Sequence, residues 1–225
     1  IVAAQVAAGV SPAELKERAR RELVERGSML DFTVPVVSLI RGRRFANMLG
    51  RLFGDAMIED LPTRFFCLSA NLSRATRRVH DRGILWRAVG ASISIPGIGP
   101  PVCEDGDLLI DGSVLTNLPV DVMREICNGS VVAVDVSAEK DLSVDRTWTE
   151  FPSPARLLVA RPWRPQGLRV PNILEILFRG AMLNCVAGER DIAERVDFYL
   201  RPPLGAVGLL DFKLLDRVEA AGYEY

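Results

Sequence analysis

A carboxylate at the end of a short apolar run is the side chain best placed to do chemistry. The run Leu108–Ile110 predicts a buried strand, Asp111 follows it, and Gly112 lets the backbone turn sharply. Pro119 then opens a predicted helix from Asp121 to Cys127. Ligands of open α/β sheets bind in the crevice outside the carboxyl ends of the strands, so Asp111 is a candidate site residue. The alternative is that its carboxylate only holds its own turn, as Asp often does.

The single histidine limits the other catalytic arrangements. His80 lies in the charged stretch 77–82, which the sequence indicates is a turn, where a histidine is more often solvated than catalytic. A Ser-His-Asp triad within this chain would depend on that one residue. The carboxylates of the stretch 104–107 are interpreted as a solvated loop before the strand. Two classes therefore remain for Asp111, a Ser–Asp dyad or a structural aspartate.

Composition places the chain among globular proteins with one good core. Its 225 residues are 48% hydrophobic and 25% charged, which suits a single domain over 1–225. The formal net charge of -1 gives no reason to expect a nucleic-acid partner. Four cysteines occur without CxxC pairing, namely Cys67, Cys103, Cys127 and Cys185. We therefore expect no zinc site, no disulfide framework, no cofactor and a cytoplasmic protein with reduced thiols.

The first residues of the chain are small and apolar. No segment reaches the roughly 18 to 20 apolar residues of a membrane span, and no signal peptide is visible. The run Ile1–Gly9 has no cap at its start, which fits a buried helix whose beginning is missing. We expect the chain to be an N-terminally truncated piece of a longer protein.

Helices and strands alternate along the chain. A capping box at Ser11–Glu14 predicts a helix to about Arg26, and the apolar run 65–69 predicts a central strand with 76–80 as its edge partner. Further elements are expected as a helix at 85–93, a strand at 130–136, a helix at 173–195, a strand at 197–200 and a helix at 211–221 that Gly222 stops. The order strand–turn–helix–strand over 108–136 is a crossover unit, which predicts an α/β fold with mainly parallel strands.

Three blocks of sequence resemble the patatin-like phospholipases, especially the branch of bacterial patatin-like esterases and the neuropathy target esterase catalytic domain. The blocks are RFFCLSANLS at 64–73, GILWRAVGASISIPG at 83–97 with PPV at 100–102, and LIDGS at 109–113 with NLPVD at 117–121 and VVAVDVS at 131–137. The tail, LLDF at 209–212 with AGY at 221–223, is similar to the end of the same branch. Order and spacing match over nearly the whole chain.

The resemblance implies a three-layer α/β/α fold that hydrolyses carboxylic esters of lipids through a Ser–Asp dyad. In that family the Asp of an Asp-Gly-Gly or Asp-Gly-Ala motif is the base for the serine, and Asp111 matches it. A serine needs such an adjacent base to be a competent nucleophile. Ser113 departs from the usual Gly or Ala, and its hydroxyl is expected to alter the hydrogen bonding of Asp111.

The larger departure from the family is the lack of its glycine-rich oxyanion loop and its Gly-x-Ser-x-Gly nucleophile elbow. Ile1–Gly9 resembles the helix that follows this elbow, so the first strands and both motifs are expected upstream of Ile1. Ser92 and Ser94 are interpreted as packing residues at a helix end near the pocket. The chain alone is therefore expected to be inactive.

The resemblance favours a serine esterase, of lysophospholipase or phospholipase type, as the parent protein. The expected partner is a lipid ester, with peripheral contact to a membrane and no nucleic acid. The competing hypothesis is a patatin-fold module without catalysis that binds lipid or a partner.

Overall fold

The computed structural model describes residues 1–26, 30–137, 176–177, 179–181, 183, 191–204, 207 and 214–225. Within these ranges helices and strands combine into the α/β class that the sequence predicts. Three short 3-10 helices, at Ile58–Asp60, Gly112–Val114 and Ala193–Arg195, supplement the longer elements.

Four strands form the larger sheet, in the order β2-β1-β4-β3. They are β1 (Cys67–Asn71), β2 (Thr76–His80), β3 (Val102–Glu104) and β4 (Asp107–Asp111). All three neighbouring pairs are antiparallel. The central strand and its polar edge partner are thus confirmed, with β1 starting two residues later than its apolar run.

The predicted mainly parallel arrangement is wrong for this sheet. Residues 72–75 join β1 to β2, and Asp105 and Gly106 join β3 to β4. Links this short permit only antiparallel pairs, because a parallel pair needs a crossover of a dozen or more residues. The hairpin β3–β4 turns through positive φ angles at both Asp105 and Gly106, a conformation that suits a tight two-residue turn.

A second, two-stranded sheet receives the crossover that the sequence predicts. The chain leaves β4, forms α5 (Val120–Ile126) and enters β5 (Val132–Val134), which pairs in parallel with β6 (Phe198–Leu200). Pro119 is the residue just before α5, as its fixed φ favours. The crossover therefore leads from β4 to a different sheet, and β5 is parallel to β6 instead of β4.

The main core lies among three helices beneath the larger sheet. These are α1 (Val2–Ala7), α3 (Arg43–Phe53) and α4 (Leu85–Ser92). Fully buried side chains include Ala4, Met48, Leu49, Leu85 and Val89. The predicted helix at 85–93 is confirmed. Its small residues allow close packing, since a Cβ on Gly90 would already touch the Leu49 side chain at 3.6 Å.

The outer helices are α2 (Pro12–Ala19), continued by a π-helical turn at Arg20–Glu25, and α8 (Leu215–Glu224). The hydroxyl of Ser11 accepts a hydrogen bond from the backbone N–H of Glu14 at 3.3 Å, which confirms the predicted cap. Ion pairs with Asp216 of α8 come from Lys16 of α2 at 3.6 Å and from Arg20 of the π-helical turn at 2.6 Å.

One predicted helix end differs from the structure, and two predicted helices lie partly outside the described residues. The predicted stop at Gly222 is wrong, because α8 continues through Gly222 to Glu224. A glycine in a helix costs only about 1 kcal/mol relative to alanine, so contacts such as those with α2 can outweigh it. The predicted helix at 173–195 lies mostly outside the described residues, and so does the start of the one at 211–221.

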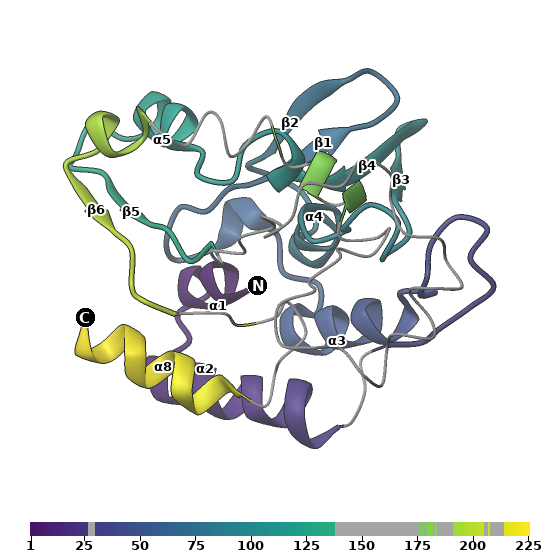
Figure 1. The fold of residues 1–225 in the computed structure, drawn as a ribbon, viewed down its shortest axis with the longest axis horizontal. Coiled ribbons are helices and arrows are strands. Elements are labelled where there is room, and N and C mark those ends of the chain that lie inside the picture. Colours follow the sequence, from purple (N-terminus) through teal and green to yellow (C-terminus); the bar gives the residue numbers. More distant parts are fainter. Residues whose placement is uncertain are drawn as a thin grey trace, which may run out of the picture.

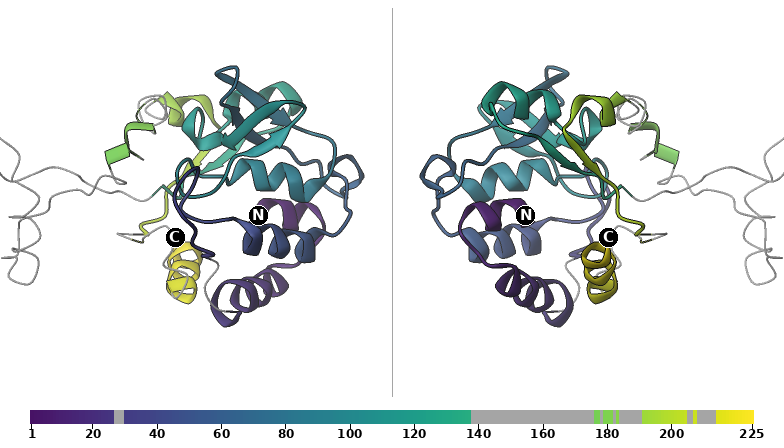
Figure 2. Two further views of the ribbon diagram at one scale, coloured as in Figure 1. Left: turned by 90° about the vertical axis from the view of Figure 1, so that its right-hand side faces the viewer. Right: turned by 90° about the vertical axis from the view of Figure 1, so that its left-hand side faces the viewer.

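Figures 1 and 2 show how these elements are layered. The larger sheet lies at the top, α4 lies beneath it, α1 and α3 come next, and α2 and α8 lie at the bottom. The carboxyl end of β4 and the carboxyl end of α4 therefore meet near the centre of the molecule, where Ser94 accepts the backbone N–H of Asp111 at 2.9 Å.

Candidate functional site

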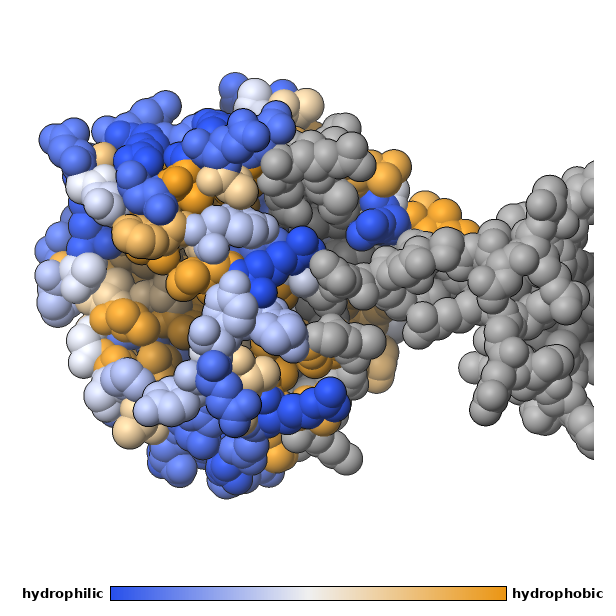
Figure 3. Space-filling view, turned by 60° about the vertical axis from the view of Figure 1, so that its left-hand side comes forward, coloured by the Kyte–Doolittle hydropathy of each residue, from blue (hydrophilic) through white to orange (hydrophobic). Residues whose placement is uncertain are grey.

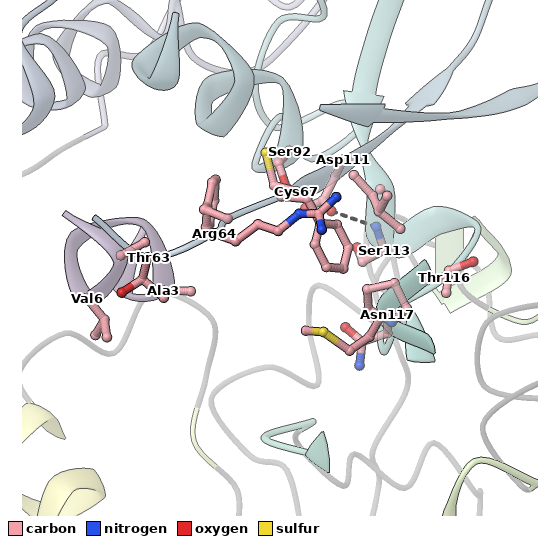
Figure 4. Close-up of a pocket in the computed structure, with 17 residues that line it drawn as sticks. Ala3, Val6, Thr63, Arg64, Cys67, Ser92, Asp111, Ser113, Thr116 and Asn117 are labelled. Carbon is pink, nitrogen blue, oxygen red and sulfur yellow. Dashed lines mark hydrogen bonds between the residues drawn. The ribbon is translucent and has the colours of Figure 1, made fainter. Parts of the chain in front are cut away.

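A cavity of about 800 Å³ lies at the carboxyl end of β4. Its walls come from α1, residues 63–68, the end of α4, residues 111–119 and the side of α5 (Figure 4). Exposed side chains of Val6 and Arg64 line it, so the cavity reaches the protein surface. Asp111, Gly112, Ser113 and Ser92 all line this one cavity, whereas Ser94 lies outside its lining.

Asp111 is held as the cap of a short helical turn. Its Oδ1 accepts a hydrogen bond from the backbone N–H of Ser113 at 2.8 Å. Burial raises the pKa of the Asp111 carboxyl, and hydrogen bonds from the backbone and hydroxyl of Ser113 oppose this effect. The carboxyl group is therefore half-buried, fixed in place and more basic than an ordinary aspartate.

Gly112 is required for space. A Cβ at this position would lie 2.5 Å from the carbonyl oxygen of Leu68 and 2.7 Å from its carbonyl carbon. The sequence predicted this glycine for a sharp turn, but its φ lies outside the left-handed region. The close approach of the turn to β1 is what excludes any side chain here.

The antiparallel sheet places residues 64–67 beside Asp111. Ser69 pairs directly with Asp111, so the chain before Ser69 extends past the end of β4 and forms a wall of the cavity. Arg64 lies on this wall and donates to the carbonyl of Ile126 at 3.1 Å. Sequence reasoning missed Arg64 because it expected parallel strands, which would have brought the carboxyl end of β1 to this place.

The thiol of Cys67 faces the same cavity (Figure 4). Burial raises the pKa of this thiol to about 12, although a hydrogen bond with Ser92 acts in the other direction. A thiol with such a pKa stays protonated at neutral pH and is a poor nucleophile. Cys67 therefore contributes an uncharged wall next to Asp111.

The histidine that was expected in a solvated turn is buried instead. His80 ends β2, where its Nε2 lies 2.8 Å from the hydroxyl of Ser69. Burial lowers the pKa of His80, so the ring is neutral at physiological pH. Ser69 is completely buried and neither residue lines the cavity of Asp111. This serine–histidine pair is therefore inaccessible to a substrate.

The carboxylates at 104–107 belong to a hairpin, which corrects their interpretation as a solvated loop. Asp107 accepts hydrogen bonds from Asn71 at 2.8 Å and from Arg74 at 2.9 Å. Glu104 forms an ion pair with Arg78 at 2.9 Å. These pairs stabilise the hairpin and stay away from Asp111.

Within the described ranges, no group of three His, Cys, Asp or Glu side chains is arranged to hold a metal ion. Cys67, Cys103 and Cys127 are free thiols. None of the helices in those ranges has the length and apolarity needed to cross a bilayer.

Comparison with known proteins gives one consistent result. A family model described as "Patatin-like phospholipase" matches residues 1–124. Patatin-like phospholipase domain-containing protein 6 of Homo sapiens is 34% identical over 225 residues, which cover 96% of this chain and 16% of that protein. Neuropathy target esterase sws of Drosophila melanogaster is 32% identical over 203 residues, 88% of this chain and 14% of that protein.

A fungal relative shows the same pattern. Lysophospholipase nte1 of Aspergillus niger is 35% identical over 199 residues, which cover 87% of this chain and 13% of that protein. The chain thus spans about a sixth or less of the length of these relatives.

Proposed function

Because the chain belongs to the patatin-like phospholipase family, we propose that it supplies the general base of an enzyme that hydrolyses carboxylic esters of lipids. Residues 1–225 are proposed as one patatin-like domain, and Asp111 as its base. Gly112 and Ser113 complete the motif that holds this carboxylate. The observation that carries the proposal is a carboxyl group with a raised pKa, fixed at a strand end inside an accessible cavity.

The partner of Asp111 in this proposal is a serine outside the 225 residues. No Gly-x-Ser-x-Gly occurs in the sequence. Helix α1 forms a wall of the cavity through Ala3, Val6 and Ala7, so chain that precedes α1 can reach Asp111. The relatives are several times longer, which is consistent with a nucleophile on an earlier segment. The 225-residue chain alone is expected to hydrolyse no ester.

The proposed mechanism uses Asp111 twice. Its carboxylate takes the proton of the serine hydroxyl while the serine oxygen attacks the ester carbonyl carbon. The tetrahedral intermediate collapses, the alcohol leaves with that proton, and an acyl-enzyme remains. Asp111 then takes a proton from water, whose oxygen attacks the acyl carbonyl carbon. As this second tetrahedral intermediate collapses, the bond to the serine oxygen breaks, Asp111 returns the proton to that oxygen, and the fatty acid is released. The raised pKa of Asp111 favours both proton transfers.

The substrate class that we propose is a lysophospholipid or phospholipid. Among the described residues of the cavity wall, Arg64 is the only Arg or Lys, and a guanidinium suits recognition of a phosphate. Val6 and Met123 add exposed apolar surface to the same cavity. Figure 3 shows several hydrophobic patches in the middle of one face of the molecule, between hydrophilic surfaces at its top and bottom.

The experiment that tests this function compares Asp111→Asn with Asp105→Asn in the full-length protein. Asp105 lies in the exposed β3–β4 turn and does not line the cavity. Release of fatty acid from a lysophospholipid should fall by roughly 100-fold or more in Asp111→Asn, which is the usual effect of losing a general base. The Asp105→Asn variant should keep wild-type turnover.

Two outcomes would contradict the proposal. Equal turnover in Asp111→Asn and wild type would remove Asp111 from the reaction. Binding of lysophospholipid without any fatty-acid release by the full-length wild type would instead support the module without catalysis.

A further inference from the structure

A loop at 32–37 exposes more apolar surface than any other short segment of the described chain. Phe32 is 68% exposed, Val34 is 77% exposed, Val36 is 86% exposed and Val37 is 67% exposed. In Figure 1 this loop extends from the right-hand side of the molecule, ahead of α3. Apolar side chains that project together from a surface mark an interaction site.

The backbone holds this loop in a defined shape. Thr33 donates to the carbonyl of Leu39 at 3.0 Å, and Arg41 donates to that of Asp31 at 2.9 Å, so the loop is a small hairpin. Its base is attached to the segment after α4, because Leu39 and Ile40 donate to the carbonyls of 97 and 98. The base is buried at Ser38 and Ile40, whereas the tip is not. The apolar tip is thus presented outward by the fold itself.

Positively charged side chains lie at the base of the loop and at the start of α3. Arg41, Arg43 and Arg44 follow the apolar tip in the sequence, and all three are exposed. The single acidic residue of the stretch 30–46 is Asp31, whose carboxylate accepts the backbone N–H groups of Gly42 at 3.0 Å and Arg43 at 2.9 Å. Three arginines and one aspartate give the stretch 30–46 a net charge of +2.

We propose that this loop docks the protein onto an anionic lipid surface. Phe32 and the valines enter the boundary between headgroups and acyl chains, while Arg41 and Arg43 contact lipid phosphates. A second copy of the chain fits less well, since the tip is convex and carries a positive flank that two copies would bring together. The inference rests on the proposed function for its lipid partner, and it assigns that contact to a named surface.

The loop is also connected to the candidate site. The segment 95–99 that anchors its base follows Ser94, whose carbonyl accepts the backbone N–H of Asp111. Docking through this loop would therefore fix the orientation of the cavity relative to the lipid surface.

The first test places an environment-sensitive fluorescent amino acid at position 36 of the full-length protein. Vesicles of phosphatidylcholine mixed with phosphatidylserine should shift its emission to the blue, and vesicles of phosphatidylcholine alone should shift it much less. The matched control is position 72, because Leu72 is also exposed, at 58%, but lies in the β1–β2 turn. Equal signals at positions 36 and 72 would overturn the proposal, whatever else anchors the protein.

The second test measures affinity for the same mixed vesicles by co-sedimentation of charge variants. Arg43→Glu should weaken binding by about 25-fold, since each unit of basic charge near an anionic surface is worth about 1 kcal/mol and this change removes two units. Arg43 is the first residue of α3, where an acidic side chain is favourable, so this variant should fold normally. Arg82→Glu is the control, because Arg82 is 82% exposed in a different turn.

The outcomes separate this inference from the proposed function. The lipid-docking proposal would be overturned if Arg43→Glu bound vesicles as tightly as the wild type. It would also be overturned if Arg43→Glu kept its vesicle binding but lost a dimer in size-exclusion chromatography. Hydrolysis of a soluble short-chain ester should be the same in Arg43→Glu and wild type. If Asp111→Asn is slow in this hydrolysis and Arg43→Glu is not, the result supports the catalytic proposal and does not bear on the docking loop.

Discussion

The carboxylate of Asp111 accepts the backbone N–H of Ser113 at 2.8 Å, two residues further along the chain. The same side chain therefore holds its own turn and faces an accessible cavity. A structural role for Asp111 is therefore compatible with the proposed catalytic role. The cap fixes the carboxylate where a proposed base must stand, at the cost of keeping a charge partly buried.

Removing that charge should stabilise the fold at neutral pH. Asn at position 111 keeps an oxygen that can accept the N–H of Ser113. Because the pKa of Asp111 is raised in the folded state, stability is lost as pH rises from the ordinary value of 3.8 through the raised value. Urea unfolding of Asp111→Asn and wild type should therefore show an advantage for the variant that is larger at neutral pH than at acid pH. An advantage that is largest in acid would show that the carboxylate is not destabilised by burial.

The hydroxyl of Ser113 should tune the basicity of Asp111. Its hydrogen bond lowers the pKa of Asp111, so Ser113→Ala should raise that pKa further. The acid limb of the pH profile of kcat/KM should then move to higher pH, because the base must be deprotonated. Ser113→Thr keeps the hydroxyl and should leave the limb near its wild-type position. A shift of the Ala variant to lower pH would contradict this account.

A methyl group at position 112 should disrupt the turn. Gly112→Ala places a carbon 2.5 Å from the backbone oxygen of Leu68, so the turn or β1 must move. Overpacking of this kind costs roughly 1 to 3 kcal/mol, measured as the change in free energy of unfolding in urea. Gly50→Ala is the control, because nothing lies within 4 Å of a Cβ there, and it should stabilise α3 by about 1 kcal/mol. Equal stability of the two variants would argue against the close contact.

His80 should make the sheet sensitive to acid. Burial lowers its pKa in the folded state, so stability is lost as pH falls from the ordinary value of 6.5 towards the lowered value. Glu104 and Asp81 oppose this effect, and Arg78 adds to it. Unfolding measured at neutral pH and at about pH 5 should show a smaller loss in His80→Gln, since this side chain does not gain a proton there. An identical loss in both proteins would assign the acid sensitivity to other groups.

The local sequence predicts individual elements well and their pairing poorly. The helix at 85–93 follows from its small apolar residues, and Pro119 marks the start of α5. The predicted direction of the strands is wrong, because it was inferred from the crossover over 108–136, and that crossover leads to the second sheet. The expectation of parallel strands hid Arg64, which reaches the cavity because β1 runs antiparallel to β4.

His80 shows a second limit of local reasoning. Its charged neighbours indicated a solvated turn, but the register pairs His80 with Cys67 and brings its ring to Ser69. Burial of this kind depends on contacts between residues distant in sequence, which a local pattern does not contain. The place of Asp111 at the end of a strand could be predicted, because its signal, a carboxylate directly after an apolar run, is itself local.

The measurement that tests the role of Asp111 most directly is the rate of serine labelling by a fluorophosphonate probe as a function of pH, in the full-length protein. This rate reports activation of the nucleophile without any choice of lipid substrate. For the wild type, labelling should rise with pH through an apparent pKa above the ordinary aspartate value of 3.8. Asp111→Asn should label slowly and without that rise. Labelling of Asp111→Asn at the wild-type rate, with the same pH profile, would show that Asp111 is not the base.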